Sequence, residues 1–328
     1  MVKEKKQDLF IGIDIGGTKI NVAVISKAGD ILFKETLKTV ENLDEKVLLK
    51  NIAEIVNRIK AKYQDIQGIG IGSAGIILYK KGIIKFSPNI GWRDFSIVKE
   101  LEKLTNLKCT LDNDANAAAW GTFYLKYSEK YKNMMCVTLG TGIGGGLILN
   151  GEMFRGSDGT AGEIGHLTYI PNGIDCSCGN KGCIERYAAS KGIAELAVNY
   201  LKEKKWKDSI IPKFANELGK ITPKSIEDAA INNDELAIKI WKEVGFMLGT
   251  VFASILNLLN LEAIHITGGI SHAQKWMEKD IIETINKSAF SVPAKTVKII
   301  FEKQNHDMGV IGAGLLVLAK NTDTESNK

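Results

Sequence analysis

One short polar segment carries side chains that could hold a metal ion. It contains one histidine and three cysteines: His166, Cys176, Cys178 and Cys183. One imidazole and three thiolates match the number and type of ligands that a tetrahedral structural zinc site prefers. The alternative, inert cysteines in a core, is weak because the segment is rich in glycine and polar residues. We therefore predict a zinc ion here, and we interpret Cys109 and Cys136, which lie on predicted strands, as core residues.

Two glycine-rich turns have the residues needed to approach phosphate groups. They are Asp14-Ile15-Gly16-Gly17-Thr18-Lys19 and Gly140-Thr141-Gly142-Ile143. Glycine lets the backbone come close to a bound group and present N–H donors to phosphate oxygens, and Thr18 adds a hydroxyl. One such turn is explained equally well as a tight hairpin, but two of them in equivalent places favour phosphate binding. Neither a Walker A sequence nor a dinucleotide fingerprint is visible, so those folds are disfavoured.

Four polar side chains in five positions follow a predicted strand, in the run Asp112-Asn113-Asp114-Ala115-Asn116. One of them is expected to cap the following helix, because Asp and Asn are favoured there. The others exceed what a cap needs. A hydroxyl that attacks a phosphoryl group must lose its proton, and a nearby aspartate can accept it. We interpret Asp114 as this candidate base, with Asn113 orienting the acceptor and Asp112 pointing to the opposite face of the strand.

The elements that must position these residues follow a repeated α/β pattern. Three β-rich runs at residues 9–15, 20–26 and 31–37 predict an antiparallel meander, and apolar residues at helical spacing between 47 and 59 predict a helix after it. Further strands are predicted at residues 69–72, 107–111, 134–139, 144–149, 263–267 and 297–301. Further helices are predicted at residues 97–104, 113–127, 184–202, 235–259, 274–288 and from 308. Because the second half begins like the first, we infer an internal duplication.

Length and composition indicate a soluble protein of two domains. A chain of 328 residues exceeds the size at which a single core usually stops growing. Hydrophobic residues at 45% and charged residues at 25% are ordinary for a globular protein. We expect a small α/β domain at residues 1–120, with a helix at 306–320 packing back on it. A larger α/β domain is expected at residues 121–305, carrying the zinc segment.

Charge and hydropathy argue against several classes of partner. The net charge of +5 comes from scattered lysines, which do not interleave with aromatic residues as on a nucleic-acid surface. Residues 1–8 are polar, so no apolar signal peptide precedes the first strand. The longest apolar run, 251–261, is shorter than the ~20 residues of a membrane span and is interpreted as a buried helix. We expect a cytoplasmic protein without disulfides that binds neither nucleic acid nor membrane.

The paired turns and the repeated pattern resemble the sugar-kinase, actin and Hsp70 superfamily. The resemblance implies a duplicated actin-like ATPase fold, with two ribonuclease H-like α/β domains that face each other across an interdomain cleft and close on ATP. It also implies that Asp14 holds Mg²⁺ through water and that Gly268 and Gly269 border the adenosine. The implied phosphate contacts are Gly16, Gly17, Thr18, Thr141 and Gly142. Lys19 is weighed evenly between a phosphate contact and a surface charge.

The histidine and cysteine segment resembles the ROK family, and within it the bacterial glucokinases. Its motif runs Glu163-Ile164-Gly165-His166, then Cys176-Ser177-Cys178-Gly179-Asn180-Lys181-Gly182-Cys183-Ile184-Glu185, and the resemblance covers residues 14–314. It implies ATP-dependent phosphorylation of glucose at O6, with Asp114 as general base, a structural Zn²⁺ and a homodimer. The implied sugar contacts are Gly75, Asn89, Asn113, Asp114, Glu163, His166 and Glu185.

Rival interpretations remain within this resemblance. ROK repressors share the same body, but a DNA-reading helix-turn-helix would need some tens of residues before the core, whereas the first strand begins at Leu9. A sugar sensor without catalysis is disfavoured by the presence of Asp114 and both turns. N-acetylmannosamine, N-acetylglucosamine and fructose kinases are poorly separated from glucokinases by sequence, and ADP or polyphosphate stays open as a donor.

Overall fold

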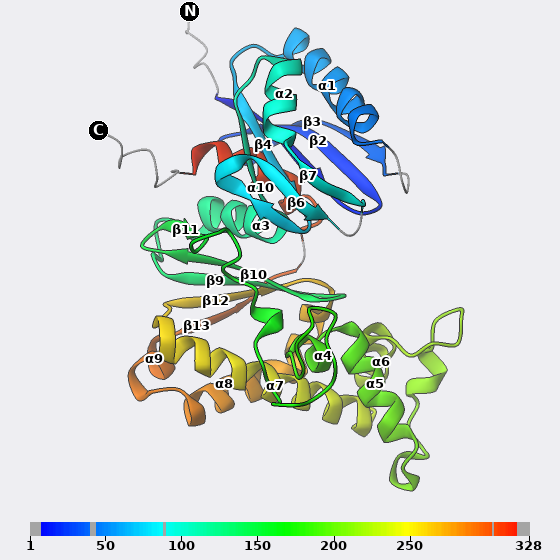
Figure 1. Cartoon of the computed structure of the whole chain (residues 1–328). Coiled ribbons are helices and arrows are strands. Elements are labelled where there is room, and N and C mark those ends of the chain that lie inside the picture. Colours follow the sequence, from blue (N-terminus) through cyan, green and yellow to red (C-terminus); the bar gives the residue numbers. More distant parts are fainter. Residues whose placement is uncertain (1–7, 40–43, 88–89, 304, 320–328) are drawn as a thin grey trace, which may run out of the picture. The chain divides into compact units, whose positions relative to one another are not determined.

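The computed structural model describes residues 8–39, 44–87, 90–303 and 305–319. The chain divides into two compact units, and most of their elements are labelled in Figure 1. Unit 1 comprises Met1–Lys132, Gly146–Gly162 and Asn305–Lys328, and unit 2 comprises Asn133–Gly145 and Glu163–Gln304. Each unit therefore contains one of the two glycine turns.

Unit 1 is built on a five-stranded sheet with the strand order β3-β2-β1-β4-β8. Its strands are β1 (Leu9–Ile15), β2 (Lys19–Ser26), β3 (Ile31–Lys38), β4 (Ile66–Ser73) and β8 (Cys109–Asn113). β2 pairs antiparallel with β1 and β3, which confirms the predicted meander. β4 pairs in parallel with β1 and β8, so the carboxyl ends of these three strands lie at one edge of the sheet. The predicted strand at 107–111 is shifted by two residues and includes Asn113.

The helices of unit 1 are α1 (Glu45–Lys62), α2 (Ile97–Thr105), α3 (Asp114–Thr122) and α10 (Met308–Leu315). A small sheet of β5 (Ile76–Leu78), β6 (Ile83–Ser87) and β7 (Trp92–Phe95) completes it. The isoleucines of β1 form a core with the apolar face of α1, whose N-cap Asp44 accepts from Lys46 N. α10 packs on β1, β4 and α3. It can approach β4 because Gly70 has no side chain, since a Cβ there would lie 1.7 Å from Ala313 O.

The predicted helix at 113–127 has two parts. Regular α-helix ends at Thr122, and a π-helical turn, Phe123–Tyr127, continues it. A π-helical segment of 5 residues is a single turn, which is too short to show a period different from that of the α-helix before it.

Unit 2 repeats the pattern of unit 1. β9 (Met134–Leu139), β12 (Ala263–Thr267) and β13 (Lys298–Phe301) are parallel in the order β9-β12-β13, as β1, β4 and β8 are in unit 1. β10 (Ile143–Leu149) begins in unit 2 and continues into unit 1, where it pairs antiparallel with β11 (Glu152–Phe154). The helices are α4 (Glu185–Ala188), α5 (Ser190–Leu201), α6 (Pro223–Ile231), α7 (Glu235–Leu259), α8 (Gln274–Ser288) and α9 (Ser291–Thr296). The predicted duplication is therefore present.

α7 is the only helix among the described ranges that is long and apolar enough to cross a membrane. Half of its most apolar window is buried inside the protein, and it packs against α8, α5 and α6. One face, including Trp241 and Phe252, is buried, whereas Ser254 and Leu258 are exposed. The core helix of a globular protein has this distribution, so we interpret α7 as a core helix.

Candidate active site

The first glycine turn joins β1 to β2 in unit 1, and the backbone N–H of Gly16 donates to Lys19 O at 3.0 Å across it. Asp14 lies at the end of β1, where its carboxylate accepts a hydrogen bond from Asn21 Nδ2 at 3.3 Å. Burial raises the pKa of Asp14, the Asn21 bond lowers it, and the charge of nearby Asp114 raises it again. Mg²⁺ prefers oxygen ligands, so the Asp14 and Asp114 carboxylates are groups that could hold such an ion.

Asp114 is the first residue of α3, directly after β8. The cap of this helix is Asn113, whose Oδ1 accepts from Ala115 N at 2.8 Å and from Asn116 N at 3.4 Å. Its Nδ2 donates to the carbonyl of Gly75 at 3.4 Å, which ties β8 to the chain after β4. Burial raises the pKa of Asp114, and a backbone N–H donated by Ala115 partly offsets that rise. Asp114 is therefore a partly buried carboxylate held at a helix start.

A buried ion pair that the sequence did not reveal supports this corner. Asp112 Oδ2 accepts from Arg155 Nε at 2.6 Å, with the two side chains only 2% and 5% exposed. Oδ1 accepts from Asn113 N at 2.8 Å and from Asn116 Nδ2 at 2.9 Å. The carboxylate thus joins the end of β8, the first turn of α3 and the segment after β11. Arg155 lies in no recognisable motif. The only feature of the sequence that could have drawn attention to it is that it is an arginine in a lysine-rich chain.

Removal of Arg155 is expected to destabilise the fold. Arg155→Met leaves the Asp112 carboxylate buried without its cation, which typically costs about 3–5 kcal/mol in the free energy of unfolding. Urea denaturation followed by circular dichroism measures it. Arg58→Met is the matched control, because Arg58 pairs with Glu35 but is 64% exposed, and such surface pairs are worth about 0–1 kcal/mol. Equal losses in the two variants would contradict the importance of the buried pair.

The second glycine turn joins β9 to β10 in unit 2. The N–H of Gly140 donates to Gly142 O at 3.0 Å, and Gly140 O accepts from both N and Oγ of Ser190, at 3.0 and 2.7 Å. The turn borders a pocket of about 310 Å³ together with Gly269, the residue that follows Gly268 after β12. Apolar and polar side chains complete its wall: Thr222, Pro223, Lys224, Glu227, Trp241, Ile270, His272 and Ala273. The lining would suit the base of a nucleotide, which is flat and has polar edges.

The four predicted metal ligands converge in unit 2. The donor atoms of His166, Cys176, Cys178 and Cys183 all lie within 4.8 Å of one another. The Sγ atoms of Cys178 and Cys183 are 3.6 Å apart, and Cys176 Sγ lies 3.7 Å from His166 Nδ1. Zn–S bonds of 2.3 Å at a tetrahedral angle would separate two sulfurs by about 3.8 Å. The spacing therefore fits a zinc ion, and Cys109 and Cys136 lie elsewhere on strands, where burial raises the pKa of each to about 12.

Glu163 and Glu185 flank the cysteine cluster at its two ends. Glu163 precedes a short 3-10 helix, Ile164–His166, and Glu185 begins α4. The predicted helix at 184–202 is broken, because Ala189 is extended and α5 begins only at Ser190. The break allows Ser190 to donate two hydrogen bonds to the second glycine turn, a long-range contact that helical periodicity does not encode.

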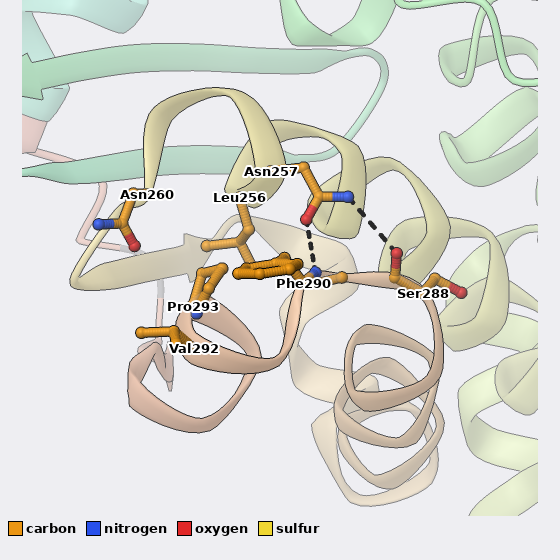
Figure 2. A pocket seen from close by; sticks show the side chains of 8 residues that line it. Leu256, Asn257, Asn260, Ser288, Phe290, Val292 and Pro293 are labelled. Carbon is orange, nitrogen blue, oxygen red and sulfur yellow. Dashed lines mark hydrogen bonds between the residues drawn. The ribbon is translucent and has the colours of Figure 1, made fainter.

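A larger pocket of about 720 Å³ lies in unit 2 where α7, α8 and α9 meet (Figure 2). Asn257 holds the chain between α8 and α9 there, accepting from Phe290 N at 2.6 Å and donating to Ser288 O at 3.5 Å. Its lining also contains Leu256, Asn260, Ala289, Val292 and Pro293, and includes no ionisable side chain. Size alone would favour this pocket, but it offers no group for proton or phosphoryl transfer.

The predicted residues fall into two sets. Unit 1 holds Asp14, Gly16, Gly17, Thr18, Lys19, Gly75, Asn113 and Asp114. Unit 2 holds Thr141, Gly142, Glu163, His166, Cys176, Cys178, Cys183, Glu185, Gly268 and Gly269. Asn89 lies outside the described residues.

Comparison with known proteins places this architecture in a family. Residues 10–320 match the ROK family. A glucokinase from Halalkalibacterium halodurans is 36% identical over 96% of this chain and 97% of its own length. The crystal structure of a ROK family glucokinase from Streptomyces griseus, in complex with glucose and AMPPNP, has a TM-score of 0.75 at 29% identity and covers 94% of this chain and 98% of that one. A xylose repressor from Caldicellulosiruptor bescii is 28% identical over 94% of this chain and 78% of the repressor.

The chain belongs to the ROK family. The predicted fold class, a duplicated actin-like ATPase fold, is thereby confirmed.

Proposed function

We propose that this protein is an ATP-dependent glucokinase that transfers the γ-phosphate to O6 of glucose. The proposal is supported by the glucokinases among its relatives, including one whose structure contains glucose and AMPPNP. In this function Asp114 accepts the proton of the attacking hydroxyl and Asp14 holds Mg²⁺ through water. Phosphate oxygens contact the turns that contain Gly16, Gly17, Thr18, Thr141 and Gly142, while Gly268 and Gly269 border the adenosine.

The observation that carries the proposal is the pair of carboxylates at one edge of the sheet in unit 1. Asp14 ends β1 and Asp114 follows β8, and they lie close enough for the charge of Asp114 to raise the pKa of Asp14. In parallel α/β sheets ligands bind outside the carboxyl ends of the strands. A phosphoryl transfer site needs both a magnesium partner and a base for the acceptor hydroxyl, and these two carboxylates supply one of each.

The proposed sugar contacts are Gly75, Asn89, Asn113, Glu163, His166 and Glu185. His166 would use its two ring nitrogens differently. Nδ1 lies beside Cys176 Sγ, and with a zinc ion bound to Nδ1 the ring would carry its proton on Nε2, from which it could donate to a sugar hydroxyl. Lys19 is exposed at the start of β2 and is proposed as an auxiliary phosphate contact.

A structural zinc ion fits the chemistry of the donor set. Burial raises the pKa of the Cys183 thiol, and the hydrogen bonds and charges of the neighbouring thiols raise it further. A bound divalent cation would remove that cost, because it would stabilise the thiolates directly. The residues His166, Cys176, Cys178 and Cys183 would hold the metal, leaving Glu163 and Glu185 at a fixed separation on either side.

Two alternatives to a glucokinase are a kinase for another sugar and a sugar-binding repressor. Another hexose kinase of the family, acting on N-acetylmannosamine, N-acetylglucosamine or fructose, would use the same residues. A sugar-binding repressor is the alternative from another class, since xylose repressors are also relatives. The partly buried Asp114 beside Asp14 favours an enzyme over that alternative. A cytoplasmic location and a homodimer stay predictions.

The test is direct. Purified protein with Mg²⁺ and ATP is incubated with glucose, and ADP and glucose 6-phosphate are measured separately. We expect the two products in equal amounts. ADP release without sugar phosphate, or glucose binding without any turnover, would contradict the proposed activity, and the second outcome would favour the repressor class.

A further inference from the structure

The backbone of Ile143, directly after the second glycine turn, is held by both ends of the cysteine segment. Its N–H donates to Glu185 Oε2 at 3.0 Å. Its carbonyl oxygen lies so close to Gly165 that a Cβ added there would stand 2.4 Å from it. All three residues belong to unit 2. The segment that carries Glu163, His166 and Glu185 therefore contacts both backbone groups of Ile143, its N–H and its carbonyl oxygen.

The turn itself is shaped around the same carboxylate. A Cβ added to Gly142 would lie 2.4 Å from Glu185 Oε2, closer than real side chains approach. The backbone of Gly142 therefore lies directly against the Glu185 carboxylate. On its other side the turn is fixed by Ser190, which donates to Gly140 O.

We propose that Glu185 is a positioning residue for the phosphate turn Gly140–Gly142 in addition to its role toward the sugar, so that this one carboxylate couples sugar affinity to nucleotide affinity. The inference rests on the proposed function and deepens it. Oε2 of Glu185 accepts from Ile143, whereas Oε1 accepts no hydrogen bond from the residues that the structure describes. A sugar hydroxyl that donates to Oε1 restricts rotation of the carboxylate, and this steadies the Ile143 N–H and the turn that precedes it.

Coupling of this kind is reciprocal, since each ligand must change the affinity of the other by the same factor. A merely structural hydrogen bond predicts something different. In that case substitution of Glu185 would weaken sugar binding alone and leave nucleotide affinity unchanged. The effect of Glu185 on nucleotide affinity therefore distinguishes the interpretations.

The first measurement is the glucose dissociation constant of Gly142→Ala in the absence of nucleotide, by isothermal titration calorimetry. The new methyl group meets only the end of the flexible Glu185 side chain, so the variant is expected to fold while its carboxylate is displaced. We expect glucose affinity to fall about tenfold, within the usual range of coupling. Gly140→Ala is the matched control, because a Cβ there meets nothing within 4 Å, and its glucose affinity should stay within about twofold of wild type.

The second measurement is the dissociation constant of AMPPNP with Mg²⁺ in the absence of sugar. Glu185→Ala is expected to weaken it about fivefold or more, and the double variant with Gly142→Ala should lose less than the two single losses combined, because both remove the same contact. Glu195→Ala, which changes a glutamate on α5 whose side chain is 44% exposed, is the control. If wild type binds both ligands and Gly142→Ala changes AMPPNP affinity alone, the coupling is overturned while the proposed function stands. If wild type binds neither ligand, the proposed function fails and the coupling fails with it.

Discussion

Replacement of Asp114 by asparagine is expected to lower kcat by roughly 10²–10⁴, the usual contribution of a general base, while the affinity for glucose changes little. Asparagine keeps the size of the side chain and removes its basicity. The helix start is preserved, because the cap of α3 is provided by Asn113. Steady-state kinetics at saturating ATP, with glucose binding measured separately by calorimetry, gives both quantities.

The pH dependence of the wild type gives a second result from the same residue. Burial raises the pKa of Asp114, and the base acts only when it is deprotonated. The rate is therefore expected to fall as the pH falls through that raised pKa, and the Asp114→Asn variant should lack this limb of the profile. If the variant retains most of its kcat and loses glucose affinity instead, Asp114 is a binding residue and another group accepts the proton.

Measurements of the Tm of the Asp114→Asn variant separate a loss of catalysis from a loss of folding. Because the pKa of Asp114 is higher in the folded state than its ordinary value of 3.8, the folded state holds that proton more tightly. The resulting stabilisation is present below pH 3.8 and is lost as the pH rises through the raised pKa. At neutral pH the buried carboxylate is thus a cost, so Asp114→Asn should have a Tm equal to or above that of wild type. A lower Tm would mean that the loss of rate includes a loss of fold.

Removal of zinc is expected to have the largest structural effect. One zinc ion per chain should be found by metal analysis, and binding to such sites contributes ~10–16 kcal/mol in small zinc-finger peptides. Stripping it with a chelator should expose the backbone amides between Glu163 and Glu185 to hydrogen exchange, because the four ligands then lose their common partner. The sheet of unit 1 should keep its protection.

Single cysteine variants give the control for this experiment. Cys183→Ser removes a fully buried ligand and should reproduce the effect of stripping, together with a loss of glucose affinity. Cys109→Ser removes a thiol on β8, outside the cluster, and should keep the zinc. Active, unstripped protein that contains no zinc would refute the assignment of the cluster.

The sequence was sufficient where spacing is local. The cysteine segment was predicted because its ligands lie close together in the chain, and the meander was predicted because alternating β-rich runs meet across short turns. The Asp112–Arg155 pair was missed, since its partners are far apart in sequence and neither lies in a motif that calls for the other. The break at Ala189 was missed for the same reason, because it depends on the contact between Ser190 and Gly140.

The side chain of Asp112 has a different environment from that of Asp114, but not for the predicted reason. It was expected to point away from Asp114 because successive strand residues face opposite sides, but residues two apart on a strand share a face. The environments of the two carboxylates differ for another reason. Asp114 has left the strand and begins α3, while Asp112 remains on β8 and is bound by Arg155. Strand alternation therefore could not identify which carboxylate is the base.

The most direct test of the proposed function is a substrate panel. The purified protein is assayed with Mg²⁺ and ATP against glucose, fructose, mannose and the N-acetylhexosamines, with ADP release as the readout. The proposed function predicts the highest kcat/KM for glucose. An N-acetylhexosamine with a kcat/KM about ten times that of glucose, a difference of about 1.4 kcal/mol in transition-state stabilisation, would contradict the proposal of a glucokinase.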